Sequence, residues 1–197
     1  MPWKQLLATA ISSVFAMHPA GGASAYIDRD FPVRGETSYV RAHHDYPAND
    51  IFAGCGRPVV APVRGVVLEV SRVDRWDPAT NRGRDRGGKF FSIEGPDGVR
   101  YYGSHLSRIE RAIEPGVTVR AGQRIGSVGR TGSARFTACH LHFGLSPVCE
   151  GTGQWWIRRG VVNPHRYLRR WESGGNLSPT SAVAARERNQ GCPAPPN

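Results

Sequence analysis

The sequence predicts one mostly β domain. Short runs rich in β-branched and aromatic residues alternate with glycine and proline throughout the chain. The stretch Gly95-Pro96-Asp97-Gly98 is a strong turn signal between two such runs, and helical periodicity is weak before residue 163. The 197 residues suffice for one domain with a sizeable core.

The predicted strands follow in order along the chain. Short β-prone runs lie between residues 39 and 70, and "RPVVAPVRGVVLEVS" is the clearest of them. Residues 74–88 are polar and arginine-rich, and a loop of this length suggests a function beyond connection. The segment "KFFSIEGPDGVRYYGSHL" then predicts a hairpin that turns at residues 95–98.

The second half of the chain continues the pattern. Residues 115–132 form short runs divided by glycine, and "HLHFGLSP" at residues 140–147 predicts a strand. Residues 163–173 predict a short helix. The tail at 174–197 is rich in serine, glycine, alanine and proline, and we expect it to be irregular.

The first 25 residues have the layout of a secretory signal peptide. Lys4 precedes a short apolar run, and Ala23-Ser24-Ala25 forms a small-x-small cleavage site. We therefore expect the folded domain at residues 26–173 and an exported protein, either periplasmic or extracellular. No later segment is apolar enough to span a membrane.

The chain carries a formal net charge of +10. Basic chains suit anionic partners, and export argues against nucleic acid, so anionic cell-envelope polymers are the expected partners. The charge could instead serve solubility alone.

Four cysteines follow the expected signal peptide, and in an oxidising compartment they predict two disulfides. Three connectivities are open. We favour Cys139–Cys149, which flank the predicted strand at 140–147, together with Cys55–Cys192, which would tie down the tail. The chain contains no CxxC pair, so a cysteine zinc site is not expected.

The histidines form the most informative set. Alternate residues of a strand share a face, so His140 and His142 would stand side by side. A catalytic zinc site takes three protein ligands and leaves a position for water, whose pKa falls to about 7. His43 or His44, with Asp50 and one histidine of the later pair, would supply such a set. The remaining histidine of the pair and His105 could hold the water and stabilise the developing negative charge.

Together these segments resemble peptidase family M23, the lysostaphin/LytM-type zinc metalloendopeptidases. The resemblance covers about residues 39–147 and includes five segments in the order of the family: "HHDYPANDIF", "GRPVVAPVRGVV", "YYGSHL", "VRAGQRIGSVGRTG" and "HLHF". It implies a compact antiparallel β-sheet domain with the active site in a groove on the sheet. We expect the loop at 74–88 to form one wall of that groove, and the alternative is a solvated loop.

The resemblance implies a role for each residue of the site. Asp50 and His142 would bind zinc, while His105 and His140 would be catalytic residues that do not bind the metal. The third ligand is expected shortly before Asp50. The position four residues before it is Tyr46, so His44 or His43 must serve. We favour His44, which is closer and would share a strand face with Asp50 at a spacing of six.

The implied function is hydrolysis of peptide cross-links in bacterial peptidoglycan by a monomeric, zinc-dependent enzyme, acting on stem or bridge peptides. The alternative is a non-catalytic LytM-like regulator of another cell-wall hydrolase. Such regulators normally lack a ligand or a catalytic histidine, whereas every required residue type is present here. A secreted domain that only binds anionic glycans would leave the histidines unexplained.

Overall fold

The computed structural model of the protein describes residue 1, residues 27–43 and residues 45–196. Its strands are β1 (Thr37–Ser38), β2 (Ala48–Ala53), β3 (Pro58–Val60), β4 (Gly65–Ser71), β5 (Phe90–Glu94), β6 (Val99–Ser104), β7 (Arg108–Ile109), β8 (Thr118–Val119), β9 (Arg124–Ser127) and β10 (His140–Pro147). They form an antiparallel seven-stranded sheet, in the order β1-β2-β10-β6-β5-β4-β8, and a three-stranded sheet, in the order β3-β9-β7. The prediction of a mostly β, antiparallel domain is confirmed.

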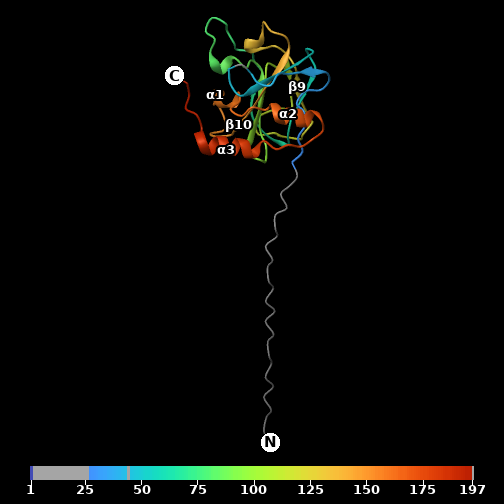
Figure 1. The fold of residues 1–197 in the computed structure, drawn as a ribbon, viewed down its shortest axis with the longest axis vertical. Helices are drawn as coiled ribbons and strands as arrows, with labels where there is room; N and C mark the ends of the chain where they lie inside the picture. Colours follow the sequence, from blue (N-terminus) through green and yellow to red (C-terminus); the bar gives the residue numbers. More distant parts are fainter. Residues whose placement is uncertain (2–26, 44, 197) are drawn as a thin grey trace.

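The two faces of β10 have different chemistry. This strand lies between β2 and β6 near the middle of the domain (Figure 1), and all of its residues are buried. Leu141, Phe143 and Leu145 belong to the hydrophobic core. His140 and His142 alternate with them and therefore lie on the opposite face. The large sheet thus has one apolar face and one face that carries polar groups.

The apolar face is covered by the small sheet and by helices. Val59 and Ile125 of the small sheet belong to the same core as β10. Helix α2 (His165–Glu172) places Trp171 with its ring centroid 6.2 Å from that of Phe143 and 6.3 Å from that of Tyr101. The helix predicted at residues 163–173 is confirmed.

The predicted hairpin is confirmed as β5 and β6. The backbone N–H of Gly95 donates to the carbonyl of Val99, and that of Gly98 donates to Gly95, which closes the turn. The predicted loop before it, at residues 74–88, contains only a short 3₁₀ turn, η1 (Gly83–Asp85).

The expectation of an irregular C-terminal tail is wrong for its central part. Residues Thr180–Gln190 form helix α3, and Val183 on this helix is buried in the core. The helix-forming alanines and arginines of "TSAVAARERNQ" outweigh the flanking glycine and proline. Among the described residues, no helix is both long and apolar enough to cross a membrane. The predicted signal peptide lies almost entirely outside the described residues.

The favoured disulfide pairing is also wrong. The structure forms Cys55–Cys139, with 5.3 Å between the Cα atoms, and Cys149–Cys192, with 6.0 Å. Cys139 and Cys149 lie at opposite ends of the extended strand β10, and eight extended residues span far more than a disulfide can bridge. By contrast, Cys55 follows β2 and Cys139 precedes β10, and these strands are antiparallel neighbours.

Candidate functional site

Two neighbouring strands bring Asp50 and His142 together. They are direct partners in the register between β2 and β10, so their side chains leave the same face of the sheet. Nδ1 of His142 lies 2.8 Å from Oδ1 of Asp50. His142 is 3% exposed, so this contact is shielded from water.

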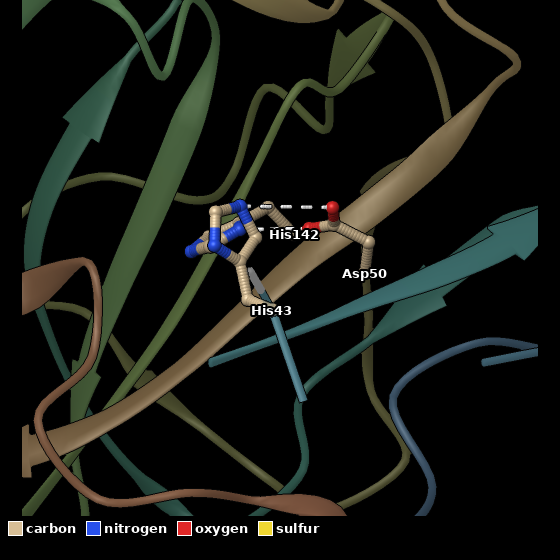
Figure 2. Close-up of side chains that lie close together, drawn as sticks. All are labelled: His43, Asp50 and His142. Carbon is tan, nitrogen blue, oxygen red and sulfur yellow. Dashed lines mark hydrogen bonds and ion pairs between the residues drawn. The ribbon is translucent and has the colours of Figure 1, made fainter. Parts of the chain in front are cut away.

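His43 approaches the same carboxylate from the segment before β2. Its backbone N–H donates to the carbonyl of Ala48, which anchors this segment to the start of the strand. Its Nε2 lies 3.8 Å from Oδ2 of Asp50, and its ring centroid lies 5.2 Å from that of His142. Figure 2 shows both imidazoles directed toward the carboxylate of Asp50. One potential ligand atom from each of the three residues lies within 4.8 Å of the other two.

A close backbone approach fixes the other edge of the His142 ring. Its Nε2 lies 2.9 Å from the carbonyl oxygen of Arg159. This carbonyl lies directly over Gly144, where an added Cβ would be only 2.4 Å from the oxygen. Any larger residue at 144 would displace the carbonyl, so the glycine is required for this contact.

The environment of His142 fits a bound cation. A carbonyl oxygen can only accept, so Nε2 must carry a proton. In a neutral ring, Nδ1 then presents a lone pair to the carboxylate of Asp50, and two acceptors face each other. Either a charged imidazolium or a cation between them resolves this conflict. Metal-binding histidines commonly donate their other N–H to a carbonyl in this way, and two imidazoles with a carboxylate are a donor set that zinc accepts.

Asp50 is held as a carboxylate. Burial raises its pKa, but the hydrogen bond with His142 and the nearby His142, His140 and His43 outweigh that effect, and its pKa falls to about 2. A group that stays ionised at all ordinary pH values is ready to bind a metal ion.

His140 and His105 complete the cluster. Nδ1 of His140 lies 2.8 Å from the carbonyl oxygen of Ala138, and Nδ1 of His105 lies 2.8 Å from that of Thr131. Each Nδ1 must therefore carry the proton, and in the neutral ring each Nε2 keeps a lone pair. The two ring centroids are 4.9 Å apart.

His105 has an unusual backbone conformation and an unusually low pKa. Its φ is 69°, in the left-handed region that non-glycine residues rarely adopt, and such strain is often found at functional sites. Burial, followed by the neighbouring His142 and His140, lowers its pKa to about 3. The ring is therefore neutral around pH 7.

These residues line one cleft on the polar face of the large sheet. Its wall includes residues 83, 84, 86 and 87 of the arginine-rich loop, in agreement with the expected groove wall. Helix α1 (Trp155–Arg158) and the residue after it, Arg159, also line the cleft, as does Tyr46. The sequence analysis missed these residues, although the dense cluster of tryptophan and arginine in "QWWIRRG" was a visible signal.

The structure thus brings four of the five predicted site residues, Asp50, His105, His140 and His142, to one cleft. The fifth, His44, lies outside the described residues. Its alternative, His43, lines the cleft beside Asp50 and His142.

Comparison with known proteins identifies relatives of this chain. The L-Ala–D-Glu endopeptidase of Bacillus subtilis (strain 168) is 30% identical in an alignment of 156 residues that covers 72% of this chain and 42% of that protein. The chain therefore spans less than half the length of this relative.

Two solved structures share the fold. A LytM protein from Ruminococcus gnavus is 24% identical with a TM-score of 0.57, over 76% of this chain and 62% of that one. The antimicrobial peptidase lysostaphin from Staphylococcus simulans is 24% identical with a TM-score of 0.51, over 81% of this chain and 55% of that one.

A sequence model of one family matches residues 44–153, which is more than half of the chain and includes Asp50, His105, His140 and His142. The protein is therefore a member of peptidase family M23.

Proposed function

We propose that this protein is an exported zinc metalloendopeptidase that hydrolyses peptide bonds in the stem or bridge peptides of bacterial peptidoglycan. The observation that carries the proposal is the convergence of a His-Asp-His ligand set with two further buried histidines in one cleft. Membership of a peptidase family supports peptide hydrolysis as the reaction.

Asp50 and His142 would hold the zinc ion together with one histidine of the pair at 43–44. The position of His43, 3.8 Å from Asp50, supports His43 for this role. The sequence pattern favours His44, so both residues must be tested. When bound, zinc would act as a Lewis acid and lower the pKa of a coordinated water to about 7.

His105 and His140 would transfer the protons of the reaction as general base and general acid. A water that attacks the peptide carbonyl carbon must lose a proton, and the leaving nitrogen must gain one as the C–N bond breaks. A neutral imidazole with a lone pair on Nε2 can take the first proton and supply the second. Once protonated, the same nitrogen donates a hydrogen bond to the oxyanion. The carbonyls of Ala138 and Thr131 keep both rings in this orientation.

Several features support action on the cell envelope. Two disulfides suit an oxidising compartment, either the periplasm or the extracellular space. The predicted signal peptide is consistent with export. A net charge of +10 favours anionic envelope polymers as further partners.

The deciding experiment is digestion of purified sacculi by the mature protein, followed by muropeptide analysis. We expect new amino and carboxyl ends in the peptides while the glycan strands stay intact. The His105→Ala variant provides the control, because it keeps the metal ligands. Unchanged sacculi, together with activation of a separate amidase by the protein, would identify a non-catalytic regulator instead.

A further inference from the structure

The cleft that holds the histidines is lined by four arginines. Arg84 and Arg86 come from the loop that contains η1, and Arg158 and Arg159 lie at the end of α1. Asp45 and Asp50 are the acidic residues that line the cleft. The histidine cluster surrounds Asp50, so the rest of the cleft wall has an excess of positive charge.

Arg158 has a structural role. Its Nη1 lies 2.8 Å from Oε1 of Glu69, and the two side chains are only 7% and 13% exposed. Its guanidinium carbon also lies 4.0 Å from the centroid of the Phe90 ring. The charge of Arg158 is thus already balanced, and this residue is not needed to explain ligand binding.

The charges of the other three arginines are not balanced by a neighbouring carboxylate in the described part of the chain. No carboxylate of the described residues lies within ion-pair distance of Arg84, Arg86 or Arg159. The Arg159 guanidinium carbon lies 4.3 Å from the ring centroid of Tyr46 and 5.5 Å from that of Trp155. Its Nε is buried and has no hydrogen-bond partner in the described structure.

Arg159 lies close to the proposed metal ligands. Its own carbonyl oxygen accepts the hydrogen bond from His142, and its guanidinium lies over the ring of Tyr46, which is itself a neighbour of His142. The ring centroids of Tyr46 and His142 are 5.6 Å apart. Because an extended peptide advances about 3.3–3.6 Å per residue, a group two or three residues from the cleaved bond reaches the guanidinium.

We propose that this cleft selects peptides with a free carboxylate within about three residues of the bond that is cut, and that Arg159 and Arg86 bind this carboxylate. The inference rests on the proposed peptidase function and defines its substrate class. Guanidinium groups bind carboxylates through paired, charge-assisted hydrogen bonds, and planar stacking on an aromatic ring presents the N–H groups in a fixed direction. An amidated substrate would lose the negative charge and this interaction.

The test compares two forms of the same purified sacculi. One portion is amidated with ammonium and carbodiimide, which converts free carboxylates into carboxamides, and the other is treated without carbodiimide. We expect the zinc-loaded wild-type protein to digest the unamidated material about 10- to 100-fold faster, the ratio expected for one lost charge-assisted hydrogen bond.

The variants Arg159→Gln and Arg86→Gln assign this preference to the cleft. Each should slow digestion of unamidated sacculi more than digestion of amidated sacculi, so the ratio falls toward one. Arg120→Gln is the matched control, since it makes the same charge change at an exposed residue outside the cleft lining. Zinc content and melting temperature, measured for each variant, show whether the site and the fold are intact.

Three outcomes would overturn one or both proposals. Equal digestion of both materials by the wild-type protein, or an unchanged ratio in both cleft variants, would contradict carboxylate selection but leave the peptidase function standing. Digestion of neither material by the zinc-loaded protein would overturn both proposals.

Discussion

His142 and Asp50 face each other across β10 and β2, with Nδ1 of the histidine 2.8 Å from Oδ1 of the aspartate. The pair exists because of strand register. A shift of β10 by one residue would turn His142 toward the apolar core and Leu141 toward the cleft. The Cys55–Cys139 disulfide lies at the end of the same strand pair and holds this register.

The first prediction separates metal ligands from the other histidines. His142→Ala should lose both zinc and activity, because two remaining protein ligands hold the metal poorly. His105→Ala and His140→Ala should retain zinc and lose about 10²- to 10³-fold in kcat, the cost of one group that stabilises the transition state. Zinc content and hydrolysis are measured side by side on the three variants. Loss of zinc in His140→Ala with retention in His142→Ala would reverse the assignment.

The second prediction concerns the third ligand. His43 lies against Asp50, so His43→Ala should lower zinc occupancy and activity together. His44→Ala serves as its neighbouring control, and both are compared by metal analysis and activity. Zinc loss in His44→Ala alone would restore the assignment that the spacing in the sequence favours.

Most of the strands, and the placement of His140 and His142 on one face, could be predicted from the sequence because these signals are local. The grouping of Asp50 and His105 with that pair came from the resemblance to family M23, since these residues lie far apart in the chain. Alternation in "HLHF" placed His140 and His142 on one face, and the turn residues at 95–98 placed the hairpin. Both predictions depend on residues that lie close together in the chain.

The features that were wrongly predicted or not predicted depend on contacts between distant parts of the chain. The pairing of Cys55 with Cys139 depends on which strands are neighbours, and that information lies in contacts across 84 residues. The role of Arg159 was equally hidden, because its carbonyl reaches His142 only through the close approach permitted by Gly144. Neither contact has a signature in a local stretch of sequence.

The third prediction concerns the disulfides. Peptide mapping under non-reducing conditions should recover Cys55 linked to Cys139 and Cys149 linked to Cys192. Replacing Cys149 and Cys192 by serine should destabilise the protein by about 2–4 kcal/mol, because the unfolded chain regains the entropy of an open loop. Denaturant titration of the variant and the wild type gives the difference. A peptide that joins Cys139 to Cys149 would contradict the structure.

The fourth prediction concerns a buried ion pair remote from the cleft. Nη2 of Arg29 lies 2.6 Å from Oδ2 of Asp97, and both side chains are almost fully buried. Tyr101 and Thr180 also donate to this carboxylate, which links the turn of the hairpin to α3. Arg29→Ala leaves the charge of Asp97 buried without its cation, so we expect a loss of about 3–5 kcal/mol in unfolding free energy.

A surface pair provides the control for this measurement. Arg34 and Asp30 form a similarly short ion pair, but their side chains are 44% and 31% exposed. Solvent screening reduces the contribution of such a pair to stability, so Arg34→Ala should lower the unfolding free energy by only about 0–1 kcal/mol. Equal losses in Arg29→Ala and Arg34→Ala, measured by denaturant titration, would show that the buried pair contributes no more than the exposed one.

The last prediction concerns removal of the metal. Chelation should abolish activity, because the proposed ligands lie in the cleft where the peptide binds. The fold should survive, because the hydrophobic core lies on the other face of the large sheet. At free zinc 100-fold above its Kd, binding adds about 2.7 kcal/mol to stability, and we expect chelation to lower Tm by on the order of 5–10 °C. Thermal denaturation with and without chelator measures this change, and added zinc should restore both Tm and activity. Complete unfolding on chelation would mean instead that the metal holds the domain together.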